Sequence, residues 1–212
     1  MSAELLRRLI EATAKTINER AEELTALDQA IGDGDHGINM ARGFGELLAQ
    51  QEALAALPLP DALREAGTAL VMKVGGASGP LYGSLLMEMG RTAPPDPAQA
   101  TLADLRRMLR AGIEAVKRRG KSDRGEKTML DVLCPVADAL DTAIERGETR
   151  TAGVRVLSAA AHALHATTYM VATKGRASYL GERSKGHMDP GACSSALLVG
   201  AVINVLEQEA DA

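Results

Sequence analysis

Residues 27–37 read LDQAIGDGDHG, with three aspartates and three glycines between positions 28 and 37. Apolar residues with helical spacing lead up to this stretch and continue after it, so it predicts a turn between two helices. Carboxylates this close in sequence repel one another unless a cation neutralises them. Carboxylate oxygens suit Mg²⁺ or Ca²⁺, and glycines let a ligand approach the main chain closely. The stretch therefore predicts a metal-binding loop that accepts a phosphate ligand.

Three other interpretations of this stretch compete with the metal-binding loop. The dinucleotide fingerprint GxGxxG fits residues 32–37, but it requires a preceding strand, whereas residues 22–30 have helical spacing. Asp33 and Asp35 inside that pattern would also repel a pyrophosphate. An EF-hand loop beginning at Asp33 would need a bidentate glutamate where the chain has Phe44. A plain turn between helices with solvated aspartates stays open as an alternative.

The composition of the 212-residue chain indicates a helical protein. Apolar residues make up 46% and aromatic residues only 2%, and strands favour aromatic and β-branched residues. A net charge of −4 gives no electrostatic basis for binding nucleic acid. Two cysteines, Cys134 and Cys193, cannot form a disulfide framework, which favours a reducing cytoplasm. Residues 1–20 are amphipathic and charged, unlike a signal peptide or a membrane span. We therefore expect a cytoplasmic protein with neither nucleic acid nor membrane as a partner.

The periodicity and the breaker residues predict eight helices and no strand, in a single all-α domain over residues 1–212. Pro135 lies inside the sixth predicted helix and should kink it. The expected helices span approximately residues 6–28, 37–57, 61–74, 80–91, 101–116, 127–146, 151–172 and 190–206.

A glycine-rich segment before the last helix, over about residues 173–191, has no helical period and predicts a lid loop. It holds four lysines and arginines against Glu182 and Asp189, and four positive minus two negative charges leave it at +2. A positive lid suits closure over an anion. A solvated surface loop is an equally good interpretation.

Three predicted helix starts carry small or flexible residues, at residues 37–39, 77–80 and 189–191. A helix N-terminus offers unpaired N–H groups and the positive end of the helix dipole, which together attract anions. If these starts converge beside the aspartates, the expected ligand is a polyphosphate complexed with metal. Three carboxylates and one divalent ion sum to −1, which repels a polyphosphate, whereas two ions give +1. We therefore expect two Mg²⁺ ions bridged by Asp28, Asp33 and Asp35.

Four stretches of the sequence match the pattern of a known family. They are LD at 27–28 with GDGDHG at 32–37, Asn39 and RGF at 42–44; VGGASGPLYG at 74–83; RGK at 119–121 with KTM at 127–129; and KGRASYLGERS at 174–184 through DPGA at 189–192. On these stretches, which cover the chain nearly end to end, the sequence resembles the L subunits, or nucleotide-binding subunits, of bacterial dihydroxyacetone kinase (the DhaL family).

The resemblance implies an eight-helix antiparallel barrel with ADP or ATP at its mouth and two Mg²⁺ ions on the three aspartates. It implies the following nucleotide contacts: His36, Gly37, Ile38, Asn39, Ala77 and Ser78 at the phosphates; Gly120 and Met129 at the adenine; and Arg176, Asp189, Pro190 and Gly191 on the lid side. Nothing departs from the family pattern at the metal positions, and Tyr82 is treated as ordinary variation.

The resemblance also implies partners. The family's sugar site lies on a separate K subunit, and a phosphohistidine on an M subunit would recharge bound ADP to ATP, so this chain would be a kinase subunit without a nucleophile of its own. A homodimer and docking on a transcriptional regulator are further possibilities. The alternatives left open are a ketose kinase domain that exchanges ATP with solution, a nucleotide-state module acting on a regulator, and a dimetal hydrolase.

Overall fold

The computed structural model describes residues 2–94 and 100–210, and within these residues it has ten α-helices and no strand. Three 3₁₀ helices, η2 (Thr149–Thr151), η3 (Thr167–Tyr169) and η4 (Arg176–Ser184), lie in the connections. The α-helices are α1 (Ala3–Glu19), α2 (Ala21–Ile31), α3 (His36–Ala49), α4 (Gln51–Ala55), α5 (Leu59–Lys73), α6 (Ser78–Thr92), α7 (Leu102–Gly120), α8 (Leu130–Glu145), α9 (Ala152–Ala166) and α10 (Pro190–Ala210).

The all-α fold class is confirmed, and eight predicted helices become ten because the first two each break once. The first breaks at Arg20 and the second at Gln50, where φ is −107° and −97° with ψ near 10°. Neither break is marked by proline or glycine. A capping box starts α7, since the Thr101 hydroxyl accepts from the Asp104 N–H at 3.2 Å and the Asp104 carboxylate accepts from the Thr101 N–H at 3.0 Å.

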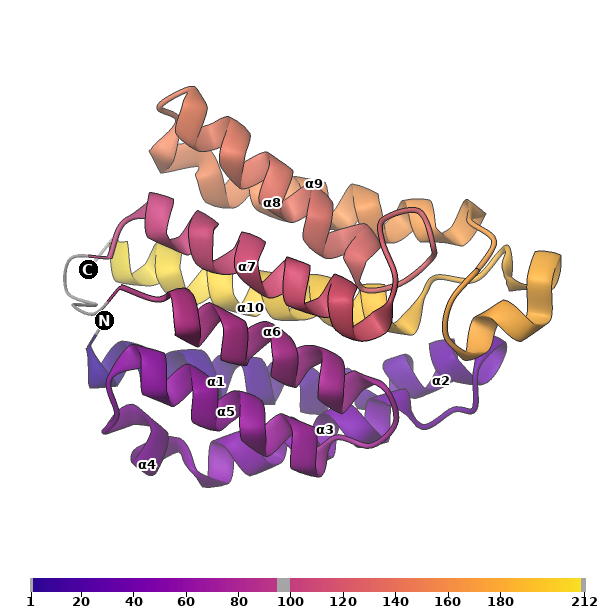
Figure 1. Cartoon of the computed structure of the whole chain (residues 1–212), viewed down its shortest axis with the longest axis horizontal. Helices are drawn as coiled ribbons and strands as arrows, with labels where there is room; N and C mark the ends of the chain where they lie inside the picture. The colour runs from indigo at the N-terminus through magenta and orange to yellow at the C-terminus, as the bar shows by residue number, and fades with distance from the viewer. Residues whose placement is uncertain (1, 95–99, 211–212) are drawn as a thin grey trace.

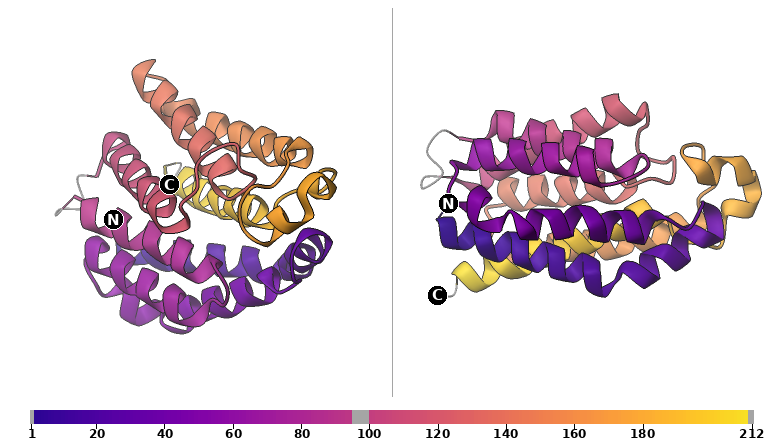
Figure 2. Two further views of the ribbon diagram at one scale, coloured as in Figure 1. Left: turned by 45° about the vertical axis from the view of Figure 1, so that its right-hand side comes forward. Right: turned by 90° about the horizontal axis from the view of Figure 1, so that it is seen from below.

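The long helices form a closed ring in which each packs against the next, in the order α1, α3, α5, α6, α7, α8, α9, α10 and back to α1 (Figures 1 and 2). Neighbours run in opposite directions, so alternate connections gather at the same end. The α2–α3, α5–α6, α7–α8 and α9–α10 connections lie together on the right of Figure 1. We call this end the mouth of the barrel. The expected antiparallel barrel is therefore confirmed.

Small side chains let the helices approach closely, which explains a core with so few aromatic residues. At the contact between α5 and α6, a Cβ on Gly67 would lie 2.7 Å from the Gly83 carbonyl oxygen, and a Cβ on Gly83 would lie 2.7 Å from that of Gly67. The ring encloses apolar side chains such as Ile17, Leu70 and Leu130, each nearly or fully buried. Most of the stability of such a barrel comes from this burial rather than from helix propensity.

Helix α10 is the one helix among the described residues whose length and composition would allow it to cross a membrane. In this structure it is a wall of the barrel, packed against α1 on one side and α9 on the other. Cys193 near its start and Cys134 in α8 are both buried and free, as expected for a chain without a disulfide framework.

Candidate metal centre at the mouth of the barrel

Asp28, Asp33 and Asp35 come together at the α2–α3 connection. Asp28 lies in the last turn of α2, and the other two lie in the short connection before α3. One carboxylate oxygen from each residue lies within 4.8 Å of those of the other two. The three residues that the sequence singles out as metal ligands are therefore placed where they can share ions.

Asp28 also holds the start of α3. Its Oδ2 accepts hydrogen bonds from the backbone N–H groups of Asp35 at 2.9 Å and His36 at 3.1 Å. These two donors would otherwise be unpaired at a helix N-terminus, so Asp28 caps α3 from the preceding helix. The buried carboxylate is fixed in position, and its Oδ1 is left for a ligand.

The charge of the three aspartates is poorly balanced by the protein itself. Among the described residues, the one cation within ion-pair distance is Arg176, whose guanidinium lies 2.9 Å from the Asp33 carboxylate. The Arg176 side chain is 65% exposed and that of Asp33 is 36% exposed, so water screens this ion pair and it contributes little. Three carboxylates and one guanidinium sum to −2, and clustered oxygen ligands with excess negative charge fit a hard divalent cation such as Mg²⁺.

His36 connects the three helix starts that carry small residues. Its Nδ1 lies 3.1 Å from the Ser78 hydroxyl at the start of α6, and its Nε2 lies 2.9 Å from the Ser194 hydroxyl in the first turn of α10. Burial is the main cause that lowers the pKa of His36, against the opposing charges of Asp28 and Asp35. A neutral ring donates through one nitrogen and accepts through the other. The three helix starts thus converge at the mouth.

Several backbone N–H groups at these helix starts have no acceptor among the described residues. In α3, the first helical hydrogen bond runs from the Asn39 N–H to Asp35 O at 2.9 Å. Asp28 accepts from the N–H groups of Asp35 and His36, so those of the two residues between His36 and Asn39 have no partner. Such groups, backed by helix dipoles, suit a phosphate. The unpaired N–H groups are those of Gly37, Ile38, Ser78, Gly79 and Gly191.

Two residues on the phosphate side differ in what their side chains can offer. The Ile38 side chain is 62% exposed and lines a shallow pocket together with Thr25 and Gln29 of α2, so its main-chain N–H is the group it offers to a phosphate. The Asn39 side chain is buried, accepts from Arg42, and sits against the α5–α6 connection, where a Cβ on Gly75 would come within 2.6 Å of it. Ala77 directly precedes α6 in that connection.

The residues expected at the adenine and on the lid side lie at the same end. Met129 is buried at the start of α8, and a Cβ on Gly191 would lie 3.6 Å from its backbone nitrogen. Gly120 is the last residue of α7. Asp189 caps α10 by accepting from the Ala192 N–H at 2.7 Å, and burial raises the pKa of Asp189 to about 7. Buried Pro190 begins α10.

The sequence reasoning missed three polar residues that support the site. The hydroxyl of buried Tyr82, a residue to which the sequence assigned no role, lies 2.8 Å from those of both Ser194 and Ser195 and so ties α6 to α10. Lys127 is buried beside the α9–α10 connection. Ser194 lies three residues after Gly191, near the start of α10. That spacing is the one sequence signal that could have indicated that Ser194 lies close to the helix start.

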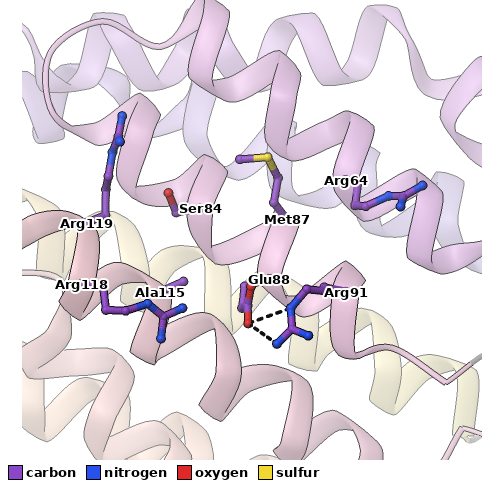
Figure 3. A pocket seen from close by; sticks show the side chains of 8 residues that line it. All are labelled: Arg64, Ser84, Met87, Glu88, Arg91, Ala115, Arg118 and Arg119. Atoms are coloured by element: carbon purple, nitrogen blue, oxygen red, sulfur yellow. Dashed lines mark hydrogen bonds and ion pairs between the residues drawn. The ribbon is translucent and has the colours of Figure 1, made fainter.

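A hollow of about 600 Å³ lies on the outer flank of the barrel, over α5, α6 and α7 (Figure 3). None of the residues expected in the site lines it. Arg91 in this hollow pairs with Glu88 at 2.7 Å. Its lining is Arg64, Ser84, Met87, Glu88, Arg91, Ala115, Arg118 and Arg119.

Comparison with known proteins gives the family. The profile described as "DAK2 domain" matches residues 30–204. The chain is 46% identical over 187 residues to a Listeria innocua protein named PEP-dependent dihydroxyacetone kinase 1, ADP-binding subunit DhaL, with 88% of each chain covered. It is 43% identical to the Escherichia coli subunit of the corresponding name, over 82% of this chain and 83% of that one. This chain belongs to the DhaL family of dihydroxyacetone kinase subunits.

A solved DhaL-related structure has the same fold. The dihydroxyacetone kinase of C. freundii, in complex with AMP-PNP and Mg²⁺, matches 97% of this chain at 25% identity and a TM-score of 0.71. This chain spans about a third of that longer protein, since the match covers 34% of it. The family assignment makes the chain a kinase, that is, phosphotransferase, subunit.

Proposed function

We propose that this DhaL-family chain is the ADP/ATP-binding, phosphoryl-transferring subunit of a dihydroxyacetone kinase in the cytoplasm. The observation that carries the proposal is the position of Asp28, Asp33 and Asp35, within 4.8 Å of one another and beside three helix N-termini. The name of the C. freundii neighbour, a kinase with AMP-PNP and Mg²⁺, supports it.

Each part of the mouth has a role in this proposal. The three aspartates hold two Mg²⁺ ions, which turns a local charge of −3 into +1 and lets a polyphosphate approach. Unpaired N–H groups of α3, α6 and α10, including those of Gly37 and Ser78, bind phosphate oxygens. Met129 and Gly120 border the adenine, since methionine offers a soft apolar surface to a flat ring. Arg176 and residues 189–191 close the lid side.

The bound ions would neutralise charge on the phosphoryl group as it is transferred. The nucleotide would carry that group from a phosphohistidine on an M subunit to the sugar on a K subunit. The relatives' names, ADP-binding subunits of PEP-dependent kinases, support such an assembly. His36 contributes by position: its neutral ring holds α3, α6 and α10 together.

The direct test measures binding of ADP with Mg²⁺ by calorimetry, together with mass spectrometry of protein purified without added nucleotide. We expect the wild type to bind Mg-ADP, and Asp33→Asn to lose most affinity for both metal and nucleotide. The matched control is Asp61→Asn, in the first turn of α5 at the opposite end of the barrel. Full nucleotide affinity in Asp33→Asn would overturn the metal bridge.

A second experiment separates phosphoryl transfer from simple nucleotide binding. With labelled phosphohistidine carrier, we expect the label on nucleotide bound to this chain, and on dihydroxyacetone only when a K subunit is present. Rapid loss of the γ-phosphate to water in the isolated chain would indicate a hydrolase instead.

A further inference from the structure

Lys127 has an unusual environment for a lysine. It lies between α7 and α8, its side chain is 1% exposed, and no carboxylate lies within ion-pair distance among the described residues. Its three ammonium N–H groups instead face four backbone carbonyl oxygens, so that one N–H is shared: Thr167 at 2.9 Å, Met170 at 3.2 Å, Ser184 at 2.6 Å and His187 at 2.7 Å. A buried cation must be compensated, and here main-chain dipoles make the direct contacts, while the charge of Asp189 acts on Lys127 from beyond ion-pair distance.

These four carbonyls lie at the two ends of one loop. Thr167 and Met170 stand where the α9–α10 connection leaves α9, and Ser184 and His187 stand where it returns. The loop between them, residues 171–183, contains most of η4. Lys127 therefore closes the neck of this loop by binding both of its sides.

Other contacts show which parts of the loop face the metal centre. At the tip, Arg176 pairs with Asp33, and Ala177 packs with Ile31 of α2. At the neck, the Ala172 N–H donates to the Ser184 hydroxyl at 2.9 Å, and the Gly186 N–H donates to Thr168 O at 2.8 Å. The tip is thus held by one exposed ion pair and a small apolar contact, whereas the neck is held by buried hydrogen bonds.

The backbone of Lys127 is itself fixed. Its φ is 62°, a left-handed conformation that few non-glycine residues adopt. The Asp131 carboxylate accepts from the Gly125 N–H at 2.5 Å and the Thr128 N–H at 2.7 Å, on either side of Lys127. Met129, the residue proposed to border the adenine, is two positions further on. One short connection therefore carries both the adenine wall and the neck of the loop.

We propose that Lys127 is a positioning residue that sets the closed state of residues 171–183 over the bound nucleotide and so controls how slowly nucleotide leaves. This inference rests on the proposed nucleotide site. The ammonium acts here as a resident monovalent cation inside a cage of carbonyl oxygens.

The test uses Lys127→Met, which keeps the aliphatic stem and removes the charge, in the full chain. We expect the rate of backbone hydrogen exchange in residues 167–187 to rise about tenfold, and the dissociation rate of Mg-ADP to rise by the same factor. The reason is that the loop loses its hydrogen bonds to a charged group, and a tenfold change is the size expected for that loss. Mn²⁺ affinity of the three aspartates without nucleotide should stay within about twofold of the wild type, because Lys127 does not touch them. Lys15→Met is the matched control, since Lys15 lies in α1, outside this connection, where its exposed side chain pairs with Glu19 at 3.9 Å.

A rescue experiment separates positioning from a general loss of stability. Lys127→Ala, folded with ammonium or potassium chloride, leaves the carbonyl cage open to a small cation. We expect these salts to restore exchange protection and slow nucleotide release, and tetramethylammonium chloride, whose cation is too large, to do neither.

Two results would overturn the inference. One is unchanged exchange and unchanged nucleotide release in Lys127→Met. The other is failure of both variants to fold even with ammonium present, which would assign Lys127 to global stability. If the wild type binds no Mg-ADP, the proposed function is wrong. Hydrogen exchange of the loop, and its rescue by ammonium in Lys127→Ala, would still decide whether Lys127 closes the neck.

Discussion

Asp28, Asp33 and Asp35 are chemically identical but sit in different surroundings. Asp28 is buried and accepts two backbone hydrogen bonds, whereas the exposed Asp33 pairs with the exposed Arg176. Residue type and spacing were enough to predict that the three lie together, and the structure brings their carboxylates within 4.8 Å of one another. The capping role of Asp28 was not predictable, because it depends on how α2 meets α3 in space.

Asp28→Ala should lose metal binding and also destabilise the protein by about 1–2 kcal/mol, since the N–H groups of Asp35 and His36 lose their acceptor. Asp33→Ala should lose metal binding with a change in stability below about 0.5 kcal/mol, because surface ion pairs contribute little. Urea unfolding in EDTA, followed by Mg²⁺ titration of the folded variants, checks both. Equal destabilisation by the two substitutions would contradict the assignment of the cap to Asp28.

Residues joined across long stretches of sequence were the hardest to predict. His36 meets Ser194 across 158 positions, and Tyr82 meets the same serine across 112. Local pattern carries no information about such pairs. Lys127 belonged to a recognised stretch, yet its role depends on carbonyl groups that any residue could supply.

Among the elements, α3 shows how closely helices must approach to build the site. A Cβ on Gly37 would lie 1.9 Å from the Ala21 carbonyl oxygen and 2.4 Å from the Thr25 hydroxyl, both in α2. Glycine at this position lets the two helices meet where Asp28 caps α3.

Gly37→Ala should therefore destabilise the protein by about 2 kcal/mol or more, because backbone of α2 must move. Gly45→Ala, in the same helix, has open space around its Cβ and should stabilise by about 0.5–1 kcal/mol through helix propensity. Thermal unfolding of both variants without metal is the measurement. A tolerated Gly37→Ala would mean that the contact between α2 and α3 is looser than described.

Helix α10 carries a pH-dependent group at its start. The pKa of Asp189 is about 7 in the folded protein because of burial, against an ordinary value of 3.8. Between these values the folded state keeps a proton that the unfolded chain has lost, so this group's contribution to stability falls as pH rises from about 4 to about 7.

In Asp189→Asn the side chain stays neutral and can still accept from the Ala192 N–H. We therefore expect the wild type to lose stability relative to this variant as pH rises. Between pH 5 and pH 8, the difference in unfolding free energy, wild type minus variant, should fall by on the order of 2–4 kcal/mol. Denaturant unfolding across this range measures it, with Asp61→Asn as the control. A difference that is constant with pH would show that Asp189 titrates normally.

Helix boundaries were predictable where local chemistry marks them. The Thr101–Asp104 capping box is an example, because both partners lie within one turn. The breaks at Arg20 and Gln50 were not, since tertiary packing bends the chain there without a breaker residue. Within the expected lid, the sequence analysis did not predict η4, because this short 3₁₀ segment has no helical period of apolar residues and Gly181 breaks it in the middle.

At the scale of the whole molecule, the pattern of apolar residues predicted the helices along the chain. That they close into a ring was predicted only by the family resemblance. Periodicity shows that a helix has an apolar face and does not show which neighbour covers it. The contact of α1 with α10 joins opposite ends of the chain, and no local signal predicts it.

The clustered charge at the mouth predicts that ligands stabilise the entire fold. Mg²⁺ with ADP should raise the midpoint of thermal unfolding, and each tenfold increase in ligand above its dissociation constant should add about 1.4 kcal/mol. Differential scanning calorimetry over a ligand series measures this shift. Asp33→Asn, which lacks one of the carboxylates, should show almost no shift, and a wild type insensitive to Mg-ADP would contradict the prediction.

The two ends of the described chain leave the barrel together, on the side away from the mouth, where Arg8 of α1 pairs with Glu209 of α10 at 2.7 Å (Figure 1). Extra polypeptide can therefore be attached genetically at either end while the mouth of the barrel stays free. Such a unit can serve as one domain of a larger protein. In the C. freundii kinase, the region that matches this chain occupies 34% of a protein about three times as long.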